Sequence, residues 1–158
     1  MSKVQFEYAQ EIQQIAEEII HQHRPQLAPL SIGYVFRWRE NIHGIGRASQ
    51  KSNATCRVCS PRERFWSGHD AVIEIEKAWW NAASDQERRA LVHHELCHLA
   101  VEDDADGRSR AVKVDHDLEE FAEVIALYGL WNTNIANFAE QAGLQLRLPI
   151  EERIATQP

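Results

Sequence analysis

The sequence contains few of the features that mark disulfide-bonded, secreted or membrane-inserted proteins. Its 158 residues include three cysteines, and an odd number this small gives no disulfide framework. No apolar run approaches the roughly 20 residues that a membrane span requires. The first residues, Met1 to Tyr8, are polar and mixed in charge, unlike a secretory signal peptide. We therefore expect a cytoplasmic protein with no membrane segment.

Basic residues are also scarce and scattered. Lysine and arginine total 17 against 24 acidic residues, which gives a formal net charge of −7. The nearest approach to a basic run is Arg57, Arg62 and Arg64, and Glu63 lies inside it. Because non-specific nucleic-acid binding needs clustered positive charge, this composition argues against a nucleic-acid partner.

Hydrophobic periodicity predicts both helices and strands in the first half of the chain. Apolar residues recur at three- and four-residue steps from Gln5 to His23, which predicts an amphipathic helix. Residues alternate from Leu30 to Trp38 and again from Ala71 to Glu76, which predicts two strands. The stretch from Asn41 to Gly68 is irregular, and we expect loops with one short strand.

The strongest helical pattern runs from Ser84 to about Glu102. Ser84 and Glu87 form a capping-box pattern, in which each side chain bonds a free backbone N–H of the other residue. Beyond this helix we expect a polar loop to Arg110, a short strand at 111–114, and helices at 117–128 and 132–142. The chain length fits one domain, which we place at 4–142 with a tail at 143–158.

The residues that carry chemistry are His94-Glu95-Leu96-Cys97-His98. Histidines four positions apart share one face of a helix, and two imidazoles so placed reach one tetrahedral metal ion. Glu95 lies beside them and can take a proton from a water that the metal activates. The plainer interpretation is a solvated helix face. The apolar flanking residues argue against it, because burying such groups without partners costs roughly several kcal/mol.

A catalytic zinc usually takes three protein ligands and keeps one position open. His116 lies 18 positions after His98 and is the preferred third ligand. Asp115 and Asp117 flank His116 and could orient its imidazole. Imidazole ligands suit zinc. The rival ligands are carboxylates of the following helix, namely Glu119, Glu120 and Glu123.

These residues resemble the phage metallopeptidase domain family. The likeness is carried by LVHHELCHL at 91–99, DHDLEEF at 115–121 and YGLW at 128–131, with YVFRWRE at 34–40, GRA at 46–48 and AWW at 78–80 upstream. That family is similar to SprT-like proteases and has a zincin-like fold. The resemblance therefore implies an α+β architecture with a small antiparallel or mixed sheet packed on helices.

The resemblance also implies an activity. It implies a zinc peptidase that holds Zn²⁺ with His94, His98 and His116, uses Glu95 as general base, and cleaves a polypeptide in the host cytoplasm of a phage or prophage. The sequence lacks the C-terminal zinc-ribbon pattern of some SprT-like proteins, which argues against a DNA-linked substrate. Zincins pair a strand edge with extended substrate, and we expect Ala71 to Glu76 to supply that edge.

Two other interpretations of the metal motif stay open. A zinc-binding interaction protein would hold the ion and cleave nothing. An HD-type phosphohydrolase would use His116-Asp117 with His93 or His94, although that architecture is all-helical and two strands are predicted here. Separately, Cys56 and Cys59 have the spacing of half a structural zinc site, but no second pair exists and ordinary loop cysteines are favoured.

Overall fold

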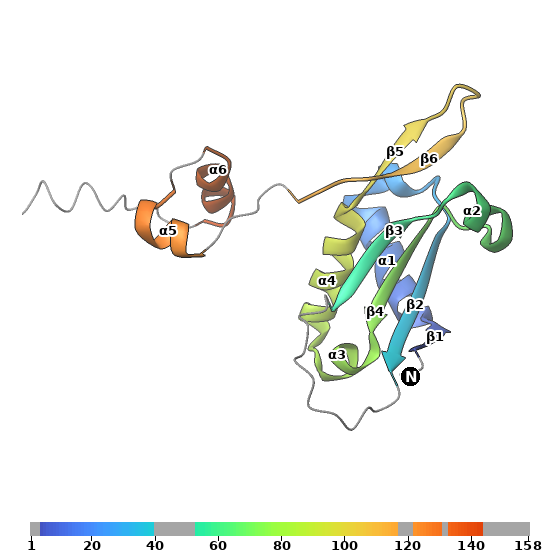
Figure 1. Cartoon of the computed structure of the whole chain (residues 1–158), viewed down its shortest axis with the longest axis horizontal. Helices are drawn as coiled ribbons and strands as arrows, with labels where there is room; N and C mark the ends of the chain where they lie inside the picture. The colour runs from blue at the N-terminus through green and yellow to red at the C-terminus, as the bar shows by residue number, and fades with distance from the viewer. Residues whose placement is uncertain (1–3, 40–52, 117–121, 131–132, 144–158) are drawn as a thin grey trace, which may run out of the picture. The chain divides into compact units, whose positions relative to one another are not determined.

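The computed structural model describes residues 4–39, 53–116, 122–130 and 133–143, and the chain divides into two compact units, Met1–Val114 and Asp115–Pro158 (Figure 1). The strands of the first unit are β1 (Val4–Tyr8), β2 (Ile32–Arg39), β3 (Ala54–Val58), β4 (Ala71–Glu76), β5 (Leu99–Asp103) and β6 (Ser109–Lys113). Its helices are α1 (Gln10–His23), the 3₁₀ turn η1 (Pro25–Leu27), α2 (Pro61–Ser67), α3 (Lys77–Ala82) and α4 (Asp85–Cys97). The second unit contains α5 (Ala122–Tyr128) and α6 (Thr133–Gln141).

Four strands of the first unit form a mixed sheet. Their order is β1-β2-β4-β3, with β2 parallel to β4 and the other neighbours antiparallel. The remaining two strands, β5 and β6, form a separate antiparallel hairpin. This arrangement confirms the predicted α+β class with a mixed sheet and helices.

The core lies between the sheet and two helices, α1 and α4, which pack on the same face of the sheet (Figure 1). The sheet contributes alternate residues of its strands, because successive side chains of a strand point to opposite faces. The fully buried side chains with the largest volumes are Ile12, Ile19, Leu27, Ile73, Ile75, Val92, Leu96 and Leu99. Among the described residues, no helix is long and apolar enough to cross a membrane.

The helix predicted from Gln5 begins later than expected. Residues 4–8 form strand β1, which pairs with β2, and α1 starts at Gln10. Phe6 fits the helical pattern of the sequence, but Val4, Phe6 and Tyr8 also alternate. The backbone hydrogen bonds that β2 offers to an edge strand decide between the two patterns.

The helix that carries the His94–His98 motif is shorter than predicted. It ends at Cys97, and residues expected to continue it form β5. The predicted loop before Arg110 is therefore a tight hairpin turn. Asp104 builds this turn, because its side chain accepts hydrogen bonds from the backbone N–H groups of Asp106 and Arg108 at 2.9 Å each.

Strand β4 is not an edge strand, so the prediction that it presents a free edge to substrate is wrong. It is paired with β2 on one side and β3 on the other. The apolar run AVIEIE is consistent with this central place, and it buries Ala71, Ile73 and Ile75 completely. The irregular stretch 41–68 contains β3 and the capped helix α2, while 40–52 lie outside the described residues.

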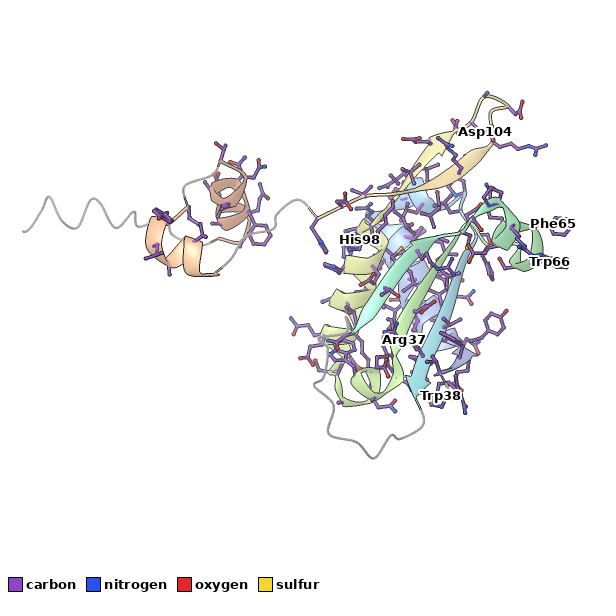
Figure 2. All side chains as sticks on the ribbon, in the orientation of Figure 1. Arg37, Trp38, Phe65, Trp66, His98 and Asp104 are labelled. Carbon is purple, nitrogen blue, oxygen red and sulfur yellow. The ribbon has the colours of Figure 1, made fainter. Side chains whose placement is uncertain are left out.

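The packing of β4 gives a prediction for stability. Ile73→Ala removes a fully buried side chain, so we expect it to lower the free energy of unfolding by about 2 to 5 kcal/mol. Phe65→Ala is the control, because Phe65 on α2 is 79% exposed (Figure 2) and should change stability by no more than about 0.5 kcal/mol. Urea unfolding followed by circular dichroism measures both values, and similar losses in the two variants would contradict this assignment of the core.

Candidate metal centre

The helix that carries the motif begins at the predicted capping box. The Ser84 hydroxyl accepts a hydrogen bond from the Glu87 backbone N–H at 3.3 Å, and the Glu87 carboxylate accepts one from the Ser84 N–H at 2.8 Å. The start at Asp85 places His94 in the last turn of α4 and makes His98 its C-cap. The motif therefore lies at the very end of the helix, where the chain turns into β5 (Figure 2).

Three histidines converge at this end of the helix. One ring nitrogen from each of His94, His98 and His116 lies within 4.8 Å of the other two. The rings of His94 and His98 are 5.1 Å apart and nearly perpendicular, at 80°. Among the described residues, no other group of three or more potential ligands comes this close. The predicted rivals Glu119 and Glu120 lie outside the described residues, as does the side chain of Glu123.

The β5–β6 hairpin explains how a histidine distant in sequence returns to the helix. Leu99 directly follows His98 and pairs with Lys113, so the chain leaving β6 runs back along the end of α4. The Val114 backbone N–H donates a hydrogen bond to the His98 carbonyl at 2.8 Å. His116 follows Val114 by two residues, so this hydrogen bond brings it close to the end of α4.

The same contact orients the imidazole of His98. Its Nδ1 lies 2.7 Å from the carbonyl oxygen of Val114. A carbonyl oxygen can only accept, so Nδ1 carries the hydrogen and donates it. Nε2 is therefore the ring nitrogen that carries the lone pair with which His98 could bind a metal ion. Metal-binding histidines are commonly oriented in this way by a backbone carbonyl.

Glu95 is the one charged side chain that is buried among the described residues, with 4% of its surface exposed. Its charge acts on the thiol of Cys56 in β3. The pKa of the Cys56 thiol is raised to about 12, first by burial and then by the charge of Glu95, while Lys113 acts in the opposite direction. The carboxyl group of Glu95 is thus buried on α4, near the edge strand β3.

The two cysteines of Cys56-Arg57-Val58-Cys59 do not form a joint site. The side chain of Cys56 lies in the hydrophobic core. Cys59 instead lines a cavity of about 330 Å³ with residues of α2, including Trp66. Both cysteines are buried and free. Both are therefore free thiols, as predicted, but Cys56 lies in strand β3 and not in a loop.

Fold and site together define an α+β protein in which a helix carrying His-Glu-x-x-His meets a third histidine at a candidate metal centre. The chain belongs to the family described as Putative phage metallopeptidase, whose model matches residues 4–142. This match confirms the family that the motifs indicated. Comparison with curated proteins and with solved structures gives no match.

Proposed function

We propose that the protein is a zinc-dependent peptidase of zincin-like fold that hydrolyses polypeptides. The observation that carries this proposal is the convergence of three imidazoles beside the buried carboxyl group of Glu95. Membership of a metallopeptidase family supports it. A solvated helix face would have no reason to bury a glutamate, because burial disfavours the charged form of a carboxyl group.

The three histidines fit a catalytic zinc ion. They offer nitrogen donors, and three protein ligands leave one tetrahedral position for water or substrate. His94, His98 and His116 would hold the ion. When bound, a zinc ion lowers the pKa of water towards neutrality and polarises the carbonyl group of the scissile bond.

Glu95 then performs the proton transfers. It neighbours His94 on the last turn of α4, yet its carboxylate oxygens are not part of the group of converging ligand atoms. We therefore assign Glu95 the role of general base, not that of a ligand. It accepts the proton of the attacking water and afterwards donates it to the leaving nitrogen of the cleaved peptide bond.

The edge strand β3 is the surface that best suits an extended substrate. The Cys59 N–H donates to the backbone carbonyl of Asp70 at 2.8 Å, and the Glu76 N–H donates to the backbone carbonyl of Asn53 at 2.8 Å. Since hydrogen-bonded pairs alternate in an antiparallel ladder, the odd-numbered residues of β3 bond to β4. The N–H and C=O groups of Cys56 and Val58 consequently point away from β4. A substrate strand could pair with these groups and so pass the end of α4.

Strand pairing with β3 predicts the effect of a proline. Val58→Pro removes one outward N–H and leaves the bonds to β4 in place, since these come from the odd-numbered residues. We expect KM for an unfolded protein substrate to rise about tenfold, with bound zinc unchanged. Val58→Ala is the matched control and should keep the original KM. A zinc-loaded, folded Val58→Pro variant with unaltered KM would refute the role of β3.

The test of the proposed activity is Glu95→Gln. Glutamine keeps the shape of the side chain but cannot accept the proton, so kcat should fall about 10²- to 10⁴-fold. Zinc content, measured by elemental analysis after purification without chelator, should stay at that of the original protein. Casein hydrolysis gives the rate. If the unsubstituted protein holds zinc and cleaves no polypeptide, the interaction-protein alternative replaces the peptidase.

The third ligand is tested by a pair of histidine variants. His116→Ala should lower zinc affinity by about 10- to 100-fold or more, because it leaves only two ligands. His93→Ala is the control from the same helix. The ring of His93 stacks on that of His23 with centroids 5.5 Å apart, away from the converging group. Competition with a chromogenic chelator measures both affinities, and equal losses would show that His116 is not a ligand.

A further inference from the structure

A groove lies at the edge of the sheet opposite to β3. At this edge β1 pairs with β2 only from Val35 onward, so the first residues of β2 have no partner strand there. It consists of two adjoining cavities of about 610 and 680 Å³ between α1 and β2. The residues common to both cavities are Gln13, Glu17, Ile32, Tyr34 and His69. None of these belongs to the candidate metal centre, so the groove is a separate feature of the molecule.

The backbone of β2 is left open along this groove. The last bond of the β1–β2 ladder runs from Ala9 N–H to the Tyr34 carbonyl at 3.0 Å, after which the chain turns into α1. By the alternation of an antiparallel ladder, the N–H and C=O groups of Ile32 face the same side as those of Tyr34. The β1–β2 register ends at Tyr8 and Val35, so Ile32 has no partner residue in β1.

A buried tyrosine forms the floor of the groove. Tyr34 is only 7% exposed and lines both cavities, and its hydroxyl forms no hydrogen bond with any described residue. Burial raises the pKa of this hydroxyl, and the charge of Glu17 raises it further. The hydroxyl oxygen is not among the buried atoms that lack a partner, so it faces the open cavities, where a bound group can replace water as its hydrogen-bond partner.

The wall of the groove is built around a glycine. The imidazole Nδ1 of His69 lies 3.0 Å from the Ser31 hydroxyl, which fixes the ring against Gly33. A Cβ atom on Gly33 would come within 2.9 Å of the His69 ring, so only glycine leaves room for it. Ser31 is also bonded to Asp70, the residue after His69, because the Ser31 N–H donates to the Asp70 carboxylate at 2.8 Å.

The charge of the groove selects the class of occupant. Glu17 is exposed along the groove, and its carboxylate accepts a hydrogen bond from the Gln13 amide at 2.7 Å. The carboxylate of Glu17, the phenolic oxygen of Tyr34 and the carbonyl of Ile32 are all acceptors. A cationic side chain complements this set, and the net charge of −7 favours its approach.

We propose that this groove binds an extended basic polypeptide segment, which adds to the sheet as a short strand beside Ile32 and places a lysine or arginine side chain on Glu17 and Tyr34. Main-chain hydrogen bonds to Ile32 would give affinity, and Glu17 would give the preference for a cation. The site does not depend on the proposed peptidase activity. In an active peptidase it would hold a substrate segment remote from the scissile bond.

The probe is a blocked, fluorescein-labelled hexapeptide of alternating lysine and valine, titrated into the full chain and followed by anisotropy. We expect saturable binding that weakens about tenfold in Glu17→Gln. Glu18→Gln is the matched control, because Glu18 instead pairs with Arg89 of α4 at 2.8 Å, and it should bind as the original protein does. Tyr34→Phe, which keeps the ring and removes the hydroxyl, should also weaken binding.

Two further measurements separate the groove from the metal centre. Backbone amide shifts in ¹⁵N-labelled protein should change at Ile32 and Tyr34 on addition of the peptide. Val58→Pro should leave the affinity unaltered, so failure of the β3 proposal and failure of this one are distinguishable. Equal effects of Glu17→Gln and Glu18→Gln, shift changes confined to β3, or undiminished binding of a peptide N-methylated at alternate residues would each overturn the proposal.

Discussion

The candidate metal centre depends on one short contact, between the end of α4 and the chain that leaves β6. The His98 Nδ1–H donates to the carbonyl of Val114 at 2.7 Å, and the Val114 N–H donates to the carbonyl of His98 at 2.8 Å. The first bond fixes which nitrogen of His98 is available to an ion. The second holds the returning chain where His116 can join the pair on the helix. Without these bonds, α4 offers only two imidazoles, which is too few for a catalytic zinc.

Burial of Glu95 carries a cost in stability, which its proposed role as general base would explain. Removing a carboxyl group from water disfavours its charged form, and natural folds rarely accept this outside functional sites. Its neighbour Cys56 stays a neutral thiol, because burial and the charge of Glu95 raise the thiol pKa to about 12. A neutral thiol neither repels the carboxylate nor acts as a nucleophile.

Both edges of the four-stranded sheet expose backbone N–H and C=O groups that could pair with another strand. The surroundings of the two edges differ. The edge strand β3 contacts α4, the helix that bears His94, and we propose that it pairs with the substrate. The start of β2, which β1 does not reach, lines a groove together with Glu17 and His69, and Glu17 gives this groove a negative charge. Since main-chain pairing has little sequence preference, any selectivity must come from side chains such as Glu17. An acidic chain with such a groove is suited to basic segments of its partners.

The sequence by itself determined the elements whose signals are local. The capping box of Ser84 and Glu87 predicted where α4 begins, and the four-residue spacing predicted that His94 and His98 share a helix face. The alternation of residues predicted strands β2 and β4. The family and the candidate third histidine, His116, also followed from motifs. Tertiary structure alone decided that 4–8 is a strand, that α4 stops at Cys97, and that β4 lies inside the sheet while β3 forms its edge. Strand pairing joins residues far apart in the chain, so no local pattern reveals which edge stays open.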